Sequence, residues 1–356
     1  MRILFRSSCL AALMCFAWTV IVKAESPAGD EQPTAESTDV QQLELIRQAG
    51  LDPEQILPLL ERPFYKFTEA EVDLYLRYLQ ASEPNLRSRV VKLARKNIGQ
   101  PYELYLLGEM PFEVYDPQPL YCLAKSDCVV FSEHTYAMAL TRDWPSFMAM
   151  LQRIRYRDGR IGVATRNHYT EADWNISNRW LVRDVTAEIA GKTAVKFQQQ
   201  IDRARFLKDR YGLVTEIPVE IHDDVYLPYG ELTRTKNQLQ DGDFVNVVRG
   251  ITSQNDENRE TFGSSAFVGH VGLIATAPDG TVDFIHSSEP KVREEPLVDY
   301  IARSNTDRPE RMKSGKPVLL GFKFLRLEEN PLANLQEFDG ADAPHVTLPG
   351  GGQAKF

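Results

Sequence analysis

The chain has 356 residues, and its 50 Asp and Glu outnumber its 41 Lys and Arg, so the formal net charge is −9 at pH 7. Such an acidic chain lacks the basic surface with which proteins hold nucleic acid, so the composition argues against a nucleic-acid partner. Four cysteines are too few for a disulfide-stapled scaffold, and the length indicates one large domain with appendages.

The N-terminus has the parts of a secretory signal peptide. Arg2 and Arg6 form a basic start, an apolar run follows over residues 9–22, and Ala24 ends a permissive cleavage site. We predict that residues 1–24 are removed and that the mature chain is exported to the periplasm or secreted. No later segment approaches the roughly 20 apolar residues that a membrane-spanning helix requires.

Removal of the signal peptide leaves two of the four cysteines, Cys122 and Cys128, and a net charge of about −12. In an oxidising compartment the pair has two alternatives, a disulfide that blocks both thiols or two free thiols. Free thiols are favoured because cysteine often packs as a small buried hydrophobe, but the sequence leaves both alternatives open.

Composition and periodicity divide the mature chain into four segments. Residues 25–40 are acidic and nearly devoid of large apolar side chains, which predicts a disordered leader. Over residues 41–94 apolar side chains recur at helical spacing between prolines, which predicts a helical N-terminal cap. Residues 95–327 form the predicted catalytic domain, and residues 328–356 lack periodicity and are predicted to be a disordered tail.

Within the predicted catalytic domain, helices come first and strands second. Helical patterns cover residues 128–140, 144–154 and 186–207. Runs of β-branched and aromatic residues bounded by turn residues then predict strands at 219–221, 243–248, 268–276, 281–286 and 318–324. This order indicates an α+β fold in which a helix packs on an antiparallel sheet.

Cys128 is the most informative residue, because it stands where polar Ser126 and Asp127 give way to an apolar run that predicts a helix. The free N–H groups and the dipole of a helix N-terminus lower the pKa of a thiol, which favours the nucleophilic thiolate. Cys128 is therefore the candidate nucleophile, and Glu133 of the same run is predicted to be solvated surface.

Two histidines, His270 and His286, lie in consecutive predicted strands. A five-residue loop over residues 276–280 places them opposite each other on one face of a hairpin. Gly272 on that face leaves room beside His270 for an approaching helix end. A thiol, a histidine base and an orienting partner together indicate a cysteine hydrolase.

These motifs resemble those of the NlpC-type papain-like cell-wall hydrolases. The resemblance starts from Asp127-Cys128 at a helix start, the His-Val-Gly-Leu-Ile strand from His270 and the Phe-Ile-His-Ser strand end at His286. Further motifs resemble the N-acetylmuramoyl-L-alanine amidase-like branch, long known only as a domain of unknown function: Gly99-Gln100-Pro101-Tyr102, Asn167-His168-Tyr169, Asp173-Trp174, and the run from Leu239 to Phe244. Residues 94–326 carry the resemblance.

The resemblance implies a role for each candidate residue. Cys128 is the nucleophile, His270 the general base and then acid, and His286 the group that orients His270. Cleft positions are implied for five residues: Tyr102, Asp127, Asn167, His168 and Trp174. His168 is the alternative third member, and packing is the alternative for both aromatic residues. This chemistry requires no metal or other cofactor, and the histidines lack zinc-protease spacing.

The implied activity is hydrolysis of an amide bond of peptidoglycan or muropeptides, between the lactyl group of N-acetylmuramic acid and the first L-alanine of the stem. Two alternatives stay open. The same residues serve an endopeptidase that cuts between γ-D-glutamate and the diamino acid, and the fold also suits a catalytically silent wall-binding module. The sequence leaves the oligomeric state open.

Overall fold

The computed structural model describes residues 35–251 and 266–339. The predicted signal peptide, residues 1–24, lies outside these ranges, as do residues 340–356 of the predicted tail. None of the helices in the described ranges has the length and hydrophobicity needed to cross a membrane.

The chain divides into two compact units, residues 1–42 and 43–356. Helix α1 (Ala35–Gln48) begins inside the segment predicted to be a disordered leader, so the prediction for residues 25–40 is wrong from Ala35 onward. At the other end, α14 (Pro331–Asp339) begins inside the predicted tail, and that prediction is likewise wrong over the length of this helix. All contacts described below belong to the second unit.

The N-terminal helices start at side-chain caps. Asp52 and Asn85 cap α2 and α4, and Thr68 and Glu71 form a capping box at α3, so in each first turn a free backbone N–H group has a side-chain acceptor. Their apolar faces share one hydrophobic core with the helix that carries Cys128. These helices are therefore part of the main core. Their bounds are α2 (Pro53–Glu61), α3 (Glu69–Ser82) and α4 (Leu86–Lys96).

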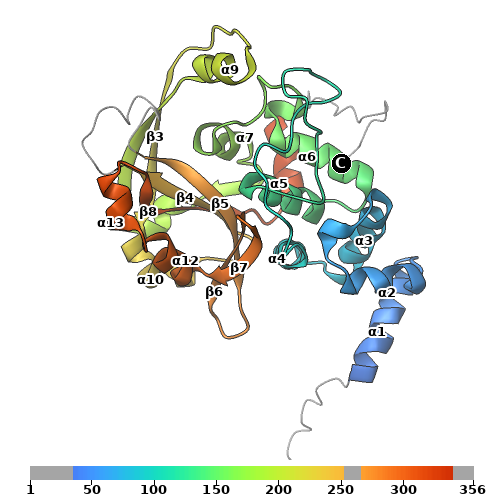
Figure 1. Ribbon diagram of the computed structural model, residues 1–356. Helices are drawn as coiled ribbons and strands as arrows, with labels where there is room; N and C mark the ends of the chain where they lie inside the picture. Colours follow the sequence, from blue (N-terminus) through green and yellow to red (C-terminus); the bar gives the residue numbers. More distant parts are fainter. Residues whose placement is uncertain (1–34, 252–265, 340–356) are drawn as a thin grey trace, which may run out of the picture. The chain divides into compact units, whose positions relative to one another are not determined.

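The strands of the described ranges form one antiparallel sheet, which confirms the predicted mixed α+β class (Figure 1). The strand order is β2-β3-β8-β4-β5-β6-β7, and β1 pairs with β8. The bounds are β1 (Val182–Asp184), β2 (Val195–Ile201), β3 (Glu220–Pro228), β4 (Phe244–Gly250), β5 (Ala266–Thr276), β6 (Val282–Ser288), β7 (Lys291–Pro296) and β8 (Val318–Leu327).

Helices cover both faces of this sheet (Figure 1). Val271, Leu273 and Ala275 of β5 pack into the core shared with α5 and α6. The alternate residues face the second core, in which Phe284 of β6 meets Tyr300 of α12. The bounds of these and the remaining helices are α5 (Cys128–Ala139), α6 (Trp144–Arg155), α7 (Asn175–Ser177), α8 (Thr186–Ala190), α9 (Arg203–Tyr211), α10 (Leu232–Thr235), α12 (Leu297–Ser304) and α13 (Arg308–Lys313).

The predicted helices at 128–140 and 144–154 are confirmed as α5 and α6, whereas the one predicted for residues 186–207 is wrong in its middle. Residues there form α8, then β2, then α9. β2 pairs with β3 along its whole length, from Val195 opposite Tyr226 to Ile201 opposite Glu220. Residues 195–201 form a strand because they pair with β3, which is distant in the sequence. Local helical periodicity does not reveal such pairing.

Candidate active site

Cys128 is the first residue of α5, as predicted, and its position is fixed by the residue before it. Asp127 is the N-cap, and its side chain accepts a hydrogen bond of 2.8 Å from the Val130 N–H. The Asp127 carboxylate is thus used to start the helix. The Cys128 side chain is half-buried at the helix N-terminus.

The thiol lies where β6 separates from β5. The two strands are paired only over residues 273–276 of β5, so the part of β5 before Leu273 is not paired with β6. The backbone N–H of Val271, in this part, hydrogen-bonds the Cys128 sulfur. Because Val271 follows His270 in the chain, the structure brings the candidate nucleophile to the strand position of the candidate base.

The resting thiol is protonated. Burial raises the pKa of Cys128 to about 12, and the neighbouring Asp127 carboxylate adds to the shift, while N–H groups of Val271, Val129 and Cys128 itself oppose it. The expected lowering by the helix N-terminus is present but smaller than the effect of burial. Nucleophilic attack therefore requires a base that takes the thiol proton.

His270 and His286 lie on one face of the sheet, and their rings are joined by a contact of 2.9 Å between His270 Nε2 and His286 Nδ1. They do not stand directly opposite each other. Leu273 pairs with Ile285, so Gly272 faces His286 and the two imidazoles meet diagonally. The prediction of one shared face is confirmed, and the predicted register is wrong by two residues.

A carboxylate completes this arrangement. His286 Nε2 lies 2.9 Å from Oε1 of Glu295 on β7, and Arg303 of α12 donates to the same carboxylate, with Nη2 2.5 Å from Oε1 and Nε 3.2 Å from Oε2. Burial opposes the charge of Glu295, but the hydrogen bonds from His286 and Arg303 hold its pKa at about 2. Tyr300 of α12 stacks on His270 with an angle of 10° between the rings. Sequence reasoning missed all three of these side chains.

A buried pair of serines ties the loop before Cys128 to the strand end after His286. Ser126 Oγ and Ser287 Oγ lie 3.0 Å apart, and the Ser287 hydroxyl donates to the Ser126 carbonyl oxygen at 2.9 Å. Gln100 Oε1 accepts from Ser126 Oγ at 2.7 Å. These contacts join the chain two residues before Cys128 to the residue that follows His286.

Gly272 serves a purpose other than the predicted one. A Cβ atom there would lie 2.5 Å from Cε2 of Phe284, 2.6 Å from the Ile285 carbonyl oxygen and 2.8 Å from the His286 Cβ. The missing side chain makes room for His286 and Phe284, where the sequence had indicated room for the thiol helix. This close approach is why the two histidines can meet diagonally.

Gly272→Ala is expected to disturb the histidine pair. The added methyl group overlaps a backbone oxygen, so β6 must shift, which costs about 1–3 kcal/mol of folding free energy and moves His286 away from His270. Thermal unfolding and turnover of a muropeptide measure the two effects. Gly230→Ala is the control, since nothing lies within 4 Å of its Cβ position. Unchanged activity in Gly272→Ala would contradict this account.

Tyr102 lies beside the candidate nucleophile. It forms a bridge with Ser126, and its backbone N–H donates to the Pro290 carbonyl oxygen at 3.0 Å. Burial raises the pKa of Tyr102 to about 12, and the charges of Cys128 and Asp127 add to the shift, which places its hydroxyl in their electrostatic surroundings. The Tyr102 hydroxyl is therefore neutral at neutral pH.

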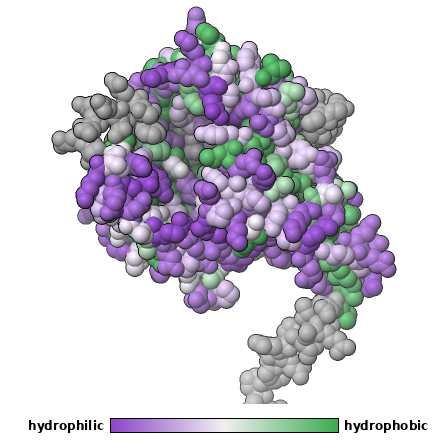
Figure 2. Space-filling view, viewed as in Figure 1, coloured by the Kyte–Doolittle hydropathy of each residue, from purple (hydrophilic) through white to green (hydrophobic). Residues whose placement is uncertain are grey.

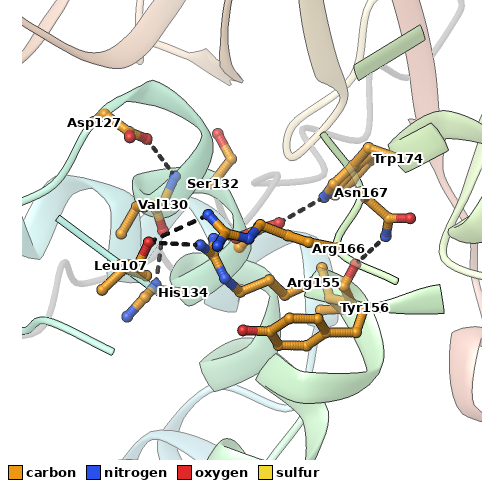
Figure 3. A network of polar contacts seen from close by, with 12 residues as sticks. Leu107, Asp127, Val130, Ser132, His134, Arg155, Tyr156, Arg166, Asn167 and Trp174 are labelled. Carbon is orange, nitrogen blue, oxygen red and sulfur yellow. Dashed lines mark hydrogen bonds and ion pairs between the residues drawn. The ribbon is translucent and has the colours of Figure 1, made fainter. Parts of the chain in front are cut away.

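Asn167 and His168 do not join this arrangement. Asn167 is buried, and its Nδ2 donates to the Ile154 carbonyl oxygen at 3.0 Å (Figure 3). His168 Nε2 lies 2.7 Å from the Val163 carbonyl oxygen, and the ring packs against Phe206. Both side chains hold the loop after α6 in place, so His286 and not His168 is the partner of His270.

Trp174 is also misplaced by the prediction. It is 1% exposed, so it cannot line a cleft, and its indole N–H donates to Glu133 Oε1 at 3.1 Å. Glu133, predicted to be solvated surface, is 1% exposed and pairs with Arg155 at 3.1 Å. This buried ion pair anchors α5 to α6 behind the thiol.

Cys122 and Cys128 are both free thiols. Cys122 packs against the small apolar cluster of Leu106, Leu107 and Val130. Within residues 35–251 and 266–339, no group of three or more His, Cys, Asp or Glu side chains has an arrangement that could hold a metal ion.

Two solved structures from different bacteria illustrate what the fold is similar to. A protein of Legionella pneumophila is 20% identical and superimposes with a TM-score of 0.62, covering 73% of this chain and 94% of its own. An N-acetylmuramoyl-L-alanine amidase of Bacteroides uniformis is 21% identical with a TM-score of 0.50, covering 68% of this chain and 99% of its own. At these identities the likeness establishes the fold. No curated protein matches the chain by sequence.

A family model provides the assignment. The AmiA-like model, described as N-acetylmuramoyl-L-alanine amidase-like, matches residues 92–306, which is more than half of the chain and contains Cys128, His270, His286 and Glu295. The chain therefore belongs to the AmiA-like, N-acetylmuramoyl-L-alanine amidase-like family.

Proposed function

We propose that this protein is an exported cysteine amidase that hydrolyses the amide bond between the lactyl group of N-acetylmuramic acid and L-alanine. Family membership supports a hydrolase that acts on amide bonds of the cell wall. The hydrogen-bonded chain from His270 through His286 to Glu295, next to a thiol at a helix N-terminus, is the observation that carries the thiol mechanism. Export rests on the N-terminal sequence alone.

In the first half of the reaction, His270 takes the Cys128 proton while the sulfur attacks the lactyl carbonyl carbon. The C–N bond then breaks, His270 returns the proton to the departing alanine nitrogen, and a thioester remains on Cys128. The first-turn N–H groups of α5, including that of Cys128, are donors for the oxygen that becomes negative. This is the acylation step of a papain-like enzyme, the superfamily to which we assign the core.

Water completes the cycle. His270 removes a proton from water, the hydroxide attacks the thioester carbonyl, and the C–S bond breaks. Return of the proton to sulfur restores the neutral thiol and imidazole, and the lactyl carboxylate leaves. The products are a free stem peptide with an N-terminal alanine and a sugar with a free lactyl carboxylate.

The loop that joins α4 to α5 suits contact with such a substrate. Between Tyr102 and Cys128 it exposes several large apolar side chains: Leu104, Tyr105, Met110, Phe112, Val114 and Tyr115. Figure 2 shows one face of the molecule, mainly hydrophilic with hydrophobic side chains reaching the surface near its middle. Because the chain is acidic, contact with an anionic wall polymer has to depend on shape and stacking more than on charge.

Mass spectrometry of defined muropeptides tests the proposal. The chain without residues 1–24 is expected to release the intact stem peptide from the sugar, and the Cys128→Ser variant is expected to release far less of it. Cleavage inside the stem would make the protein an endopeptidase with the same residues. No thiol-dependent product from any muropeptide would reject the amidase and favour a wall-binding module.

A further inference from the structure

A line of hydrogen-bonding groups runs away from the thiol through two histidines. His270 Nε2 and His286 Nδ1 are 2.9 Å apart, and His286 Nε2 is 2.9 Å from Glu295 Oε1. Each contact needs one hydrogen between its two heavy atoms. The protonation of Glu295 therefore determines which ring nitrogen of His286, and then of His270, carries the hydrogen.

The carboxylate end is fixed. Arg303 donates two hydrogen bonds to Glu295, and these bonds together with that from His286 keep the carboxyl ionised at neutral pH. An ionised carboxylate only accepts hydrogen bonds. The hydrogen between Glu295 and His286 thus belongs to Nε2 of His286.

Burial determines the protonation of His286, the group between Glu295 and His270. His286 is 1% exposed, and burial lowers its pKa although Glu295 opposes the shift, so the resting ring is neutral. A neutral imidazole with a hydrogen on Nε2 has a lone pair on Nδ1. His286 Nδ1 therefore accepts, and His270 Nε2 donates.

We infer that Glu295 is a positioning residue that holds both histidines in the Nε2–H form and so leaves Nδ1 of His270 as the free base for the thiol. This inference rests on the proposed function only for the role of His270 as base. Glu295 touches no reacting atom. It acts through His286, as a carboxylate acts through an imidazole in hydrolase triads.

The charges around the pair make Glu295 important for a second reason. A positive charge on the His270 ring is disfavoured first by burial, then by His286, and then by Arg249, Arg303 and Arg293. Cys128 is neutral before the reaction. When His270 takes the thiol proton, the histidine pair becomes positively charged. The Glu295 carboxylate, which is hydrogen-bonded to His286, stabilises this charge.

The test is Glu295→Gln, with Glu294→Gln as its control. Glu294 is the neighbouring residue on β7 and is also an ion-paired carboxylate, with Arg95 Nη2 2.7 Å from its Oε1. A glutamine at 295 can donate its amide N–H to His286 Nε2, which permits the opposite form with hydrogens on Nδ1 of both rings. Nitrogen-15 NMR of the histidine side chains reads these forms directly in protein without substrate.

The wild-type protein and Glu294→Gln are expected to show Nε2–H on both rings. Glu295→Gln is expected to populate Nδ1–H on His286 and to lower kcat by about 10- to 100-fold with KM nearly unchanged. Loss of the negative charge also lowers the proton affinity of the pair, so the acid limb of the kcat/KM profile moves to lower pH.

Two results would overturn the inference. One is an Nδ1–H form of His286 in the wild-type protein, and the other is a Glu295→Gln variant with wild-type ring forms and wild-type kcat. The NMR measurement is independent of turnover. Wild-type Nε2–H rings in a protein that cleaves no muropeptide would therefore reject the proposed function while supporting the assignment of Glu295.

Discussion

Replacing Cys128 by serine is expected to lower muropeptide turnover by a factor on the order of 10⁴ or more, with the fold unchanged. A serine hydroxyl is a far weaker acid than a thiol, so transfer of its proton to His270 costs more free energy. The helix start does not depend on the sulfur, because Asp127 provides the cap. Steady-state kinetics and circular dichroism measure the two quantities.

Cys122→Ser is the matched control for this variant. Cys122 is also a free thiol, but it packs against Leu106 and Leu107, so its loss affects stability and leaves turnover near the wild-type value. An alkylating reagent is expected to inactivate the wild type and to leave the residual rate of Cys128→Ser unchanged. Wild-type turnover by Cys128→Ser would reject the thiol mechanism.

The sequence predicted the elements that carry Cys128, His270 and His286 because each element is defined locally. Asp127 is a strong helix-start residue, and the two histidines lie in β-patterned runs joined by a short loop. Such signals involve only a few consecutive residues and depend little on the tertiary structure around them. The register of the hairpin was less accessible, because it depends on which residue pairs the sheet core selects.

The position of Glu295 could not be predicted from the residues around it. β7 has the sequence Lys-Val-Arg-Glu-Glu-Pro, a charged run without the apolar alternation that marks a strand. It is a strand because it pairs with β6, where Phe284 stands opposite Glu295. The short turn between Ser288 and Lys291 was the sequence signal that could have predicted β7, because a short turn after one strand is typical of a hairpin.

Glu133 and Trp174 were misplaced for the opposite reason. Glu133 was interpreted as a charged residue on a helix surface and Trp174 as part of a motif after the cysteine, but Glu133 contacts both Trp174 and Arg155 inside the core. The partners are separated by 41 and 22 positions along the chain. A charged side chain in an apolar helix can be solvated or buried with a partner, and only the tertiary contacts distinguish the two cases.

His270→Ala is expected to lower turnover by about 10²- to 10⁴-fold, the range that general acid–base catalysis supplies. His286→Ala is expected to retain more activity, since the base remains and only its orientation is lost. The order follows from the geometry, because Val271, the neighbour of His270, hydrogen-bonds the thiol, whereas His286 contacts His270 and Glu295. Kinetics of both variants with one muropeptide measure the difference.

His168→Gln separates the two candidate partners of His270. His168 hydrogen-bonds the Val163 carbonyl oxygen and packs against Phe206, so its replacement is expected to change stability while kcat stays near the wild-type value.

Added imidazole should restore part of the activity of His270→Ala by filling the vacated site and taking the thiol proton. A His286→Ala variant with less activity than His270→Ala would reverse the assigned roles and place the base on β6.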